Sequence, residues 1–358
     1  MKWNIATPDE ALGACEKPLL TKVDQLNLAP EDCLILCAGF EDRALASIKK
    51  GAEAGMQFRV LLIQYTPFVE ENRIAALRDL CASHHLEFEE IAYDRCQPAG
   101  FGVRLMDALH SYSGALYIDI SAMSRLLIVQ IIVALGRRPS GFSRCIVVYT
   151  EAENYPPSEE EARQELIRSD DDPTFSILFL SSGVFEITIL PELSSIAIAG
   201  SQTRLIAFPS LDAHHLTALR VELQPSRYSF IEGMPPSPAN RWRQEVISKL
   251  NRLNDVRDAE FCSASTLDYR ETLDCLLAQY RKHYIRDRLL ISPTGSKMQS
   301  VAVGLFRSFV EDVQIVYPTP RGFCSPTCYT RGIGAIYVLD LSPFTLEATQ
   351  HRHTSQMG

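Results

Sequence analysis

The chain has 358 residues, of which 46% are hydrophobic and 22% charged, and its formal net charge is −9. This length predicts two domains, and the negative charge disfavours non-specific binding to DNA or to a membrane surface. The longest apolar run, residues 126–135, is too short to span a bilayer, and no basic segment followed by an apolar one opens the chain. We therefore expect a cytoplasmic protein without a membrane partner.

Strand-like and helix-like segments alternate through the first half of the chain. The predicted strands are residues 33–38, 59–65, 87–93, 115–120 and 145–150, and the predicted helices between them are 42–54, 71–84, 103–112 and 126–136. The strands are continuous apolar runs, which is typical of parallel strands with helices on both faces of the sheet. Residues 184–190 are predicted to close this sheet.

An acidic segment, residues 151–173, separates the predicted strand 145–150 from the closing strand. It contains three consecutive glutamates after Ser158, a pattern that favours a solvated helix capped by that serine. A lid or a contact with a partner protein is the functional alternative.

The second half of the chain repeats the alternation. Its predicted strands are residues 204–208, 228–232, 260–264, 288–291 and 313–317, with helices 214–223, 240–254, 269–283 and 298–309 and a closing strand 335–341. Ser124-Arg125 and Ser296-Lys297 precede corresponding helices, 172 residues apart (296 − 124). Other pairs keep nearly this offset, so we predict two tandem Rossmann-like doubly wound parallel-sheet domains, residues 31–193 and 203–345, related by pseudo-two-fold symmetry.

Cysteine usage indicates a reducing compartment. Six of the ten cysteines lie within predicted strands or helices, where reduced cysteine acts as a small apolar residue; they are Cys33, Cys37, Cys81, Cys145, Cys262 and Cys275. The loop pair Cys324 and Cys328 lacks two further nearby ligands. We therefore expect no metal site.

The segment Ser292 to Met298 lies between a predicted buried strand and an apolar helix. Thr294, Gly295, Ser296 and Lys297 could simply cap this helix. However, a basic residue in a first helical turn is unfavourable against the macrodipole, and a bound anion would explain its presence. The same reasoning applies to the first copy, in which the corresponding ligand-binding candidates are Ser121, Ser124 and Arg125.

Further candidates follow other predicted strands. Glu41 and Arg43 could form a local ion pair, or could bind the ribose hydroxyls and phosphate of a nucleotide. Asp119 sits in a predicted buried strand and needs a partner, for which Arg43 and Arg125 are candidates. Arg321 follows the last parallel strand of the second copy. Neither a Walker A motif nor a dinucleotide fingerprint is present, so we predict no cofactor.

The sequence Thr294-Gly295-Ser296-Lys297-Met298 resembles the Thr-Gly-Gly-Thr-Lys-x-Met type of motif in CARF domains, the CRISPR-associated Rossmann folds of bacterial antiviral defence. Between its threonine and its lysine it is one residue shorter than that motif, and it lacks the second glycine. Residues 120–125 form a more distant variant of it. The resemblance therefore rests on one short motif together with the expected architecture of both copies.

This resemblance implies a sensor that binds an anionic nucleotide second messenger of the cyclic oligonucleotide type. The ligand would lie in a cleft between two Rossmann-like halves, with Lys297 and Arg125 on either side, and the signal would pass to an effector protein. The alternative is an enzyme that hydrolyses or transfers a nucleotide or phosphorylated metabolite at the same cleft, with Glu41, Asp119 or Glu232 as acid or base. A scaffold with a vestigial cleft is a third possibility.

Overall fold

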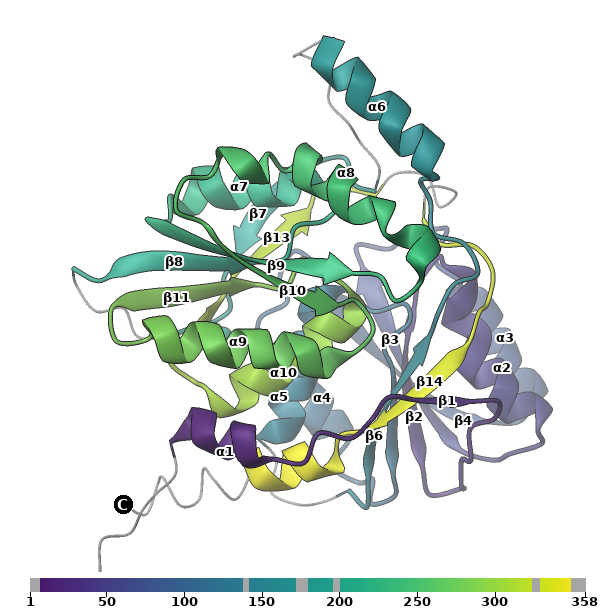
Figure 1. The fold of residues 1–358 in the computed structure, drawn as a ribbon. Coiled ribbons are helices and arrows are strands. Elements are labelled where there is room, and N and C mark those ends of the chain that lie inside the picture. The colour runs from purple at the N-terminus through teal and green to yellow at the C-terminus, as the bar shows by residue number, and fades with distance from the viewer. Residues whose placement is uncertain (1–6, 138–141, 172–179, 196–199, 324–328, 349–358) are drawn as a thin grey trace, which may run out of the picture. The chain divides into compact units, whose positions relative to one another are not determined.

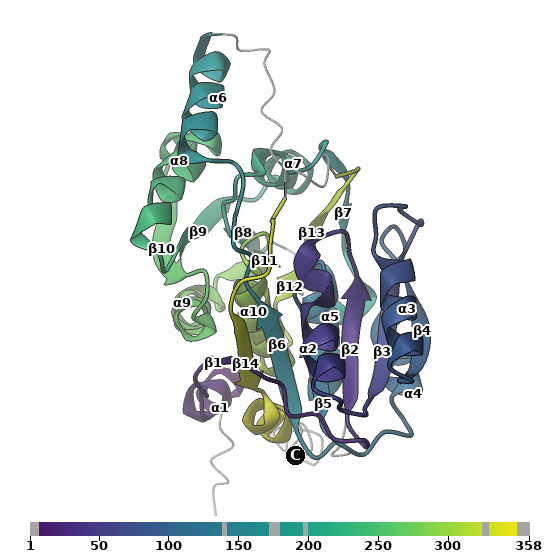
Figure 2. The same ribbon diagram turned by 90° about the vertical axis from the view of Figure 1, so that its right-hand side faces the viewer.

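A computed structural model describes residues 7–137, 142–171, 180–195, 200–323 and 329–348. The chain divides into two compact units, which Figures 1 and 2 show. Unit 1 comprises residues 1–154 and 330–358, and unit 2 comprises residues 155–329. Each unit contains its own sheet and its own helices.

Unit 1 is built on a seven-stranded sheet with the order β1-β14-β6-β5-β2-β3-β4. The five strands from β6 to β4 are parallel, β14 is antiparallel to β6, and β1 is antiparallel to β14. The strands are β1 (Thr21–Val23), β2 (Cys33–Ala38), β3 (Arg59–Thr66), β4 (Glu87–Asp94), β5 (Leu116–Asp119), β6 (Cys145–Thr150) and β14 (Ile336–Asp340).

Apolar side chains explain how the helices of unit 1 cover its sheet. Every residue of β2 is buried, as expected for a strand covered on both faces. One core cluster joins β2 and β3 to helices α2 and α3. Helix α5, which is buried over most of its surface, packs against α4. The helices are α1 (Pro8–Ala14), η1 (Asp42–Leu45), α2 (Ala46–Glu53), α3 (Ile74–Ser83), α4 (Phe101–Ala108) and α5 (Arg125–Gly136).

Unit 2 contains a parallel five-stranded sheet with the order β10-β9-β8-β11-β12. Figure 1 shows α7 and α8 on one face of this sheet and α9 and α10 on the other. The strands are β8 (Gln202–Ala207), β9 (Arg227–Met234), β10 (Glu260–Ser265), β11 (Asp287–Ser292) and β12 (Gln314–Ile315). The helices are α7 (Ala213–Leu223), η3 (Pro238–Asn240), α8 (Trp242–Leu250), η4 (Leu253–Asp255), α9 (Tyr269–His283) and α10 (Lys297–Phe309).

The parallel strands of the two units follow the same order. Numbered from the first parallel strand of each unit, β2 or β8, the order is 3-2-1-4-5 in both sheets. This is the Rossmann order 3-2-1-4-5-6 without its sixth strand, and the predicted fold class, α/β with Rossmann-like parallel sheets, is confirmed. Ser124 and Ser296 both cap the helix after the fourth strand. The pseudo-two-fold relation between the units stays a prediction.

The strands expected to close each sheet pair differently from the prediction. Residues 335–341 were expected to close the second sheet, but β14 pairs with β6 of unit 1. Residues 184–190 were expected to close the first sheet, but β7 (Val184–Thr188) pairs with β13 (Tyr317–Pro320) inside unit 2. The predicted boundaries, 31–193 and 203–345, therefore differ from the observed units. An apolar pattern specifies a strand but not which of two similar edges it joins.

The acidic segment forms helix α6 (Glu159–Asp171), and η2 (Pro191–Leu193) follows β7. The predicted serine cap is present: the Ser158 hydroxyl accepts from the N–H of Glu161, and the Glu161 carboxylate accepts from the N–H of Ser158. The helix is not solvated all round, because Ala162 is buried in a small cluster with Leu211 and Val246.

The predicted reduced state of Cys262 and Cys275 is wrong, because the two residues form a disulfide. Helix α9 lies over β10 and brings the two Cα atoms to 6.5 Å, within the range that a disulfide spans. Sequence alone does not show which strand a helix covers. The pair Cys324 and Cys328 lies outside the described residues.

Candidate functional site

Hydrogen bonds between loops join four strand ends at the carboxyl edge of the unit 2 sheet. The Thr294 hydroxyl, after β11, donates to the carbonyl of Phe208, after β8, at 2.7 Å. The Ser296 hydroxyl donates to the carbonyl of Thr266, after β10, at 2.6 Å. The N–H of Thr266 donates in turn to the carbonyl of Met234, the last residue of β9, at 2.9 Å. The N-terminus of α10 is therefore fixed at the edge where parallel sheets bind ligands.

A capping box begins α10. The Ser296 hydroxyl accepts from the N–H of Gln299 at 3.1 Å, and Gln299 Oε1 accepts from the N–H of Ser296 at 2.8 Å. Lys297 is the first residue of the helix and is partly buried. Its positive charge lies at the positive end of the helix dipole, an arrangement that an anion at this position would stabilise.

The glycines of this edge serve close internal packing. A Cβ atom at Gly295 would lie 2.2 Å from Gln299 Oε1 and 3.0 Å from the Cβ of Phe208. A Cβ atom at Gly233 would lie 2.9 Å from Thr266 Cγ2. A glycine at this position also lets a ligand approach the backbone closely. The structure supplies a second reason, which is that the Gln299 amide lies against the backbone at this position.

Gln299 has an unsatisfied donor. The residue is 2% exposed, and within the described part of the chain its Nε2 makes no hydrogen bond, although its Oε1 caps α10. A buried amide nitrogen without an acceptor costs about 1–3 kcal/mol. Its position beside Gly233 and Gly295, at the end of the helix that carries Lys297, points to an acceptor oxygen on a ligand.

Glu232 lies near the end of β9, next to Gly233. It is half-buried, and burial raises the pKa of its carboxyl above the ordinary value. Of the three acid or base candidates, Glu232 is the one on the unit 2 sheet. A carboxyl group that keeps its proton to a higher pH can donate it.

The corresponding turn in unit 1 is also capped internally. The Ser124 hydroxyl accepts from the N–H of Leu127 at 3.3 Å, and the N–H of Ser124 donates to the Tyr65 hydroxyl at 2.6 Å. Ser121 is fully buried, and its hydroxyl accepts from the N–H of Thr150 at 2.8 Å. Arg125 is the first residue of α5 and is partly buried.

Glu41 and Arg43 form the local ion pair, one of the two alternatives left open by the sequence. Arg43 Nη2 lies 2.7 Å from Glu41 Oε2, and the two side chains are 5% and 11% exposed. Arg43 also donates to the carbonyl of Thr150 at 3.1 Å, and the Thr330 hydroxyl bonds to the Glu41 carboxylate. Their polar atoms are therefore engaged within unit 1.

The hydrogen-bond partners of Asp119 differ from the two expected arginines, although the charge of Arg43 does act to lower the pKa of its carboxyl. Its carboxylate accepts from the Ser47 hydroxyl and from the N–H of Ser121, not from Arg43 or Arg125. Burial raises the pKa of this carboxyl, and the hydrogen bonds from Ser121 and Ser47 only partly oppose the effect. Asp119 is only 2% exposed and therefore lies within the core of unit 1.

Arg321 is separate from the α10 turn in the topology. It follows β13, its side chain is exposed, and its N–H donates to the carbonyl of Gly183 at 3.0 Å. It therefore extends from the two-stranded β7–β13 ribbon and not from the five-stranded sheet.

Sequence reasoning missed Gln299, although the Ser-x-x-Gln spacing of a capping box could have indicated it.

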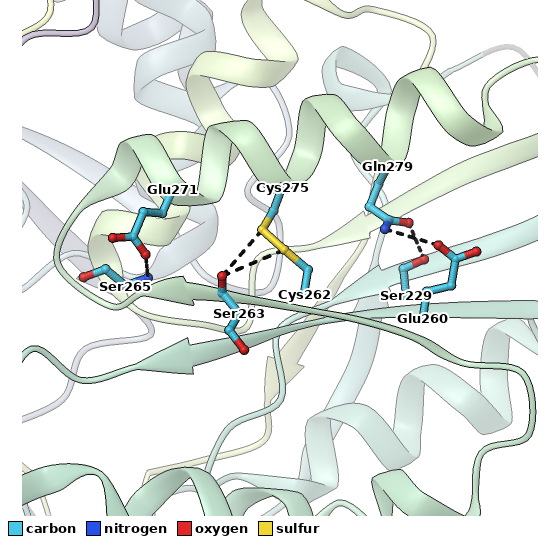
Figure 3. The surroundings of a disulfide bond; sticks show 8 residues. All are labelled: Ser229, Glu260, Cys262, Ser263, Ser265, Glu271, Cys275 and Gln279. Carbon is cyan, nitrogen blue, oxygen red and sulfur yellow. Dashed lines mark hydrogen bonds between the residues drawn. A yellow bond between two sulfur atoms is a disulfide. The ribbon is translucent and has the colours of Figure 1, made fainter.

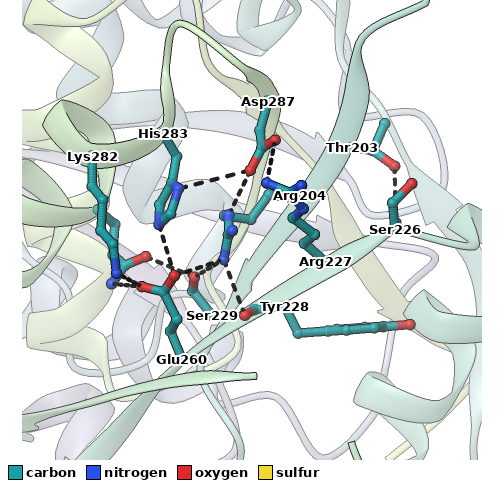
Figure 4. Close-up of polar contacts among 11 residues, drawn as sticks. Thr203, Arg204, Ser226, Arg227, Tyr228, Ser229, Glu260, Lys282, His283 and Asp287 are labelled. Atoms are coloured by element: carbon teal, nitrogen blue, oxygen red, sulfur yellow. Dashed lines mark hydrogen bonds and ion pairs between the residues drawn. The ribbon is translucent and has the colours of Figure 1, made fainter. Parts of the chain in front are cut away.

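A buried ion network lies at the opposite, amino edge of the unit 2 sheet (Figure 4). Arg204 Nε lies 2.8 Å from Asp287 Oδ2, and these side chains are 4% and 1% exposed. Arg204 Nη1 is 3.5 Å from Glu260 Oε1, and His283 Nε2 is 3.1 Å from the same oxygen. Because its charges are mutually compensated, we assign this network to the stability of the sheet.

The fold and the capped turn define a Rossmann-like α/β protein with a candidate anion site at a helix N-terminus. No protein-family model matches the chain, and no curated protein matches it either. No helix in the described ranges is long and apolar enough to cross a membrane. The same residues hold no group of three or more His, Cys, Asp or Glu side chains suited to a metal ion.

Some solved structures show a weak likeness. The cytoplasmic domain of a prokaryotic cation chloride cotransporter has 10% identity and a TM-score of 0.24, covering 81% of this chain and 95% of that one. A ketoreductase domain from the bacillaene assembly line has 10% identity and a TM-score of 0.21, covering 95% of this chain and 80% of that one. UDP-GlcNAc 2-epimerase from Neisseria meningitidis, bound to UDP-GlcNAc, has 8% identity and a TM-score of 0.22, covering 91% of this chain and 99% of that one. These scores carry no argument about function.

Proposed function

We propose that this protein is a sensor of an anionic nucleotide second messenger, of the cyclic oligonucleotide type, in antiviral defence. The ligand phosphate binds at the N-terminus of α10, and the signal passes to an effector protein. The observation that carries this proposal is the buried amide nitrogen of Gln299, which has no acceptor among the residues that the structure describes and lies in the first turn of the helix that begins with Lys297. A phosphate oxygen would accept from this donor and would be attracted by the charge of Lys297 and by the helix dipole.

The two units differ in how much they offer a ligand. In unit 2, Gln299 caps the helix and still has an unused donor. In unit 1, the N–H of Ser124 is taken by the Tyr65 hydroxyl, and Glu41 pairs with Arg43. We therefore expect the α10 turn of unit 2, with Lys297, to bind phosphate more tightly than the α5 turn of unit 1, with Arg125.

The test begins with mass spectrometry of any ligand retained by the purified protein, followed by calorimetry with cyclic oligonucleotides of two to six nucleotides. Lys297→Ala should weaken binding about tenfold or more, because it removes a charge-assisted contact. Arg125→Ala should weaken it less, and Lys249→Ala, an exposed lysine on α8, serves as the control for lost charge. Equal affinities for Lys297→Ala and the unmodified chain would contradict the assignment.

A nucleotide-processing enzyme is the second candidate, and the raised pKa of Glu232 favours it. Such an enzyme would convert the nucleotide while Glu232 supplies a proton to the leaving group. Chromatography of the ligand after incubation separates the two functions. Conversion that is lost in Glu232→Gln, with binding retained, assigns an enzyme, whereas an intact ligand supports the sensor.

A further inference from the structure

Cys262 and Cys275 form a disulfide, whereas the other described cysteines are free thiols. Cys33 and Cys145 are buried in the unit 1 sheet, where burial raises the pKa of each thiol to about 12 and makes it a poor nucleophile. Cys262, by contrast, lies on β10, the edge strand of the unit 2 sheet, and is only partly buried. Figure 3 shows Cys275 reaching it from α9.

The disulfide encloses the turn that connects β10 to α9. Within this turn the Ser265 hydroxyl accepts from the N–H groups of Leu267 and Asp268, at 3.1 and 3.0 Å. The turn also contains Thr266, whose carbonyl accepts the Ser296 hydroxyl at the start of α10. The covalent link therefore holds a segment that positions the candidate ligand site.

Other contacts hold α9 on the sheet on both sides of the disulfide. The Glu271 carboxylate accepts from the N–H of Ser265 at 2.7 Å, and the Ser229 hydroxyl donates to Gln279 Oε1 at 2.7 Å (Figure 3). Opening of the disulfide would remove the middle link of the three and leave the helix docked. Its effect is expected to be local to the turn and not a general unfolding.

We propose that Cys262 and Cys275 form a reversible thiol–disulfide exchange site for a protein dithiol, and that reduction loosens the Thr266 turn and weakens ligand binding at α10. The second half of this proposal rests on the proposed function. Cys262 Sγ is the sulfur that is attacked, because Cys275 is buried, at 8% exposed, whereas Cys262 on the edge strand is only partly buried.

The exchange balances in two steps. A thiolate of the dithiol attacks Cys262 Sγ, the Cys262–Cys275 bond breaks, and its electron pair goes to Cys275 Sγ, which takes a proton. The second thiol of the dithiol then attacks the mixed disulfide and releases Cys262 as a thiol. The two cysteines gain two electrons and two protons, and the dithiol leaves as a disulfide.

The test uses the full chain, with and without dithiothreitol. Mass spectrometry measures the alkylation of each cysteine, and hydrogen–deuterium exchange of the backbone amides is measured peptide by peptide. Reduction should add two alkylated cysteines, Cys262 and Cys275, and speed exchange of residues 263–268 about tenfold or more. In the double variant Cys262→Ser/Cys275→Ser, amide exchange of this turn should be as fast as in the reduced protein, with and without dithiothreitol. Cys96→Ser, which removes an exposed thiol elsewhere, should respond to reduction as the unmodified chain does.

Two outcomes would overturn the exchange site: alkylation of both cysteines in protein purified without reductant, or turn exchange that does not respond to reduction. Pyrophosphate is the probe for the coupling, and it should protect residues 294–300 more strongly in the oxidised protein. Equal protection in both states removes the coupling but not the exchange site. No protection in either state contradicts the proposed function, while the alkylation and exchange data still decide the redox site.

Discussion

Glu260 shows how one side chain in unit 2 links stability to pH. Burial raises the pKa of its carboxyl, but hydrogen bonds from Lys282 and His283, together with the charges of His283 and Arg204, outweigh burial and lower the pKa to about 2 from 4.5. Because the folded pKa is the lower one, ionised Glu260 stabilises the folded chain fully above the unfolded pKa. This contribution is lost as the pH falls from about 4.5 through 2.

Glu260→Gln should therefore lower the free energy of unfolding at pH 7 by about 1–3 kcal/mol, a range that allows for partial solvent screening. Urea unfolding at pH 7, 5, 4 and 3 measures the difference, which should be constant down to about pH 5 and shrink below it. Glu222→Gln, on the exposed end of α7, is the control and should change little at any pH. A difference that does not vary with pH would show that the interaction is not ionic.

Helix α10 begins at Lys297, one residue before its predicted start, because the signals that start a helix are local. A serine followed three residues later by glutamine is enough to indicate the cap, and an apolar run follows it. Ser124 likewise caps α5, although Leu127 occupies the position of the glutamine. By contrast, the close approach of Gly295 to Phe208 depends on how the loops after β8 and β11 meet, and no local pattern indicates it.

Gly295→Ala tests whether the close contact at the start of α10 stabilises the element. The added Cβ would lie 2.2 Å from Gln299 Oε1, so the amide must move and the cap must be lost. We expect a loss of about 1–3 kcal/mol in the free energy of unfolding, measured with urea. In a Gln299→Ala background the same substitution should cost much less, because the obstructing amide is gone. Additive losses in the double variant would contradict this account.

Across the whole molecule, the sequence predicted the parallel strands and their alternation with helices, but not how the closing strands pair. The inner strands, such as β2, β5 and β11, have buried apolar runs that the sequence makes visible, whereas most residues of the edge strands β4 and β10 are exposed or only partly buried. The pairing of β7 with β13 and of β14 with β6 depends on long-range contacts, because similar strand edges compete for each of them. The partners of Asp119 and the Cys262–Cys275 disulfide were missed for a related reason, since both depend on which helix covers which strand.

Because β14 pairs with β6, a C-terminal truncation is expected to destabilise unit 1. A chain ending at Tyr329 loses β14, whose Ile336 to Asp340 pair with β6 and whose Leu339 is fully buried. Strand β6 then becomes an unpaired apolar edge, and several kcal/mol of burial are lost from unit 1. Amide exchange should become at least about tenfold faster at residues 145–150 and stay unchanged at residues 202–207 and 287–292.

Truncation after Ala348 is the matched control, because it keeps the whole of β14 and should leave exchange in both units as in the full chain. If β14 instead closed the second sheet, as the sequence pattern predicted, the shorter chain would lose protection at β11 and β12 and keep it at β6. The two arrangements therefore place the damage in different sheets. A single exchange experiment on the two truncated chains distinguishes them, because the peptides that cover β6 and β11 are read in the same sample.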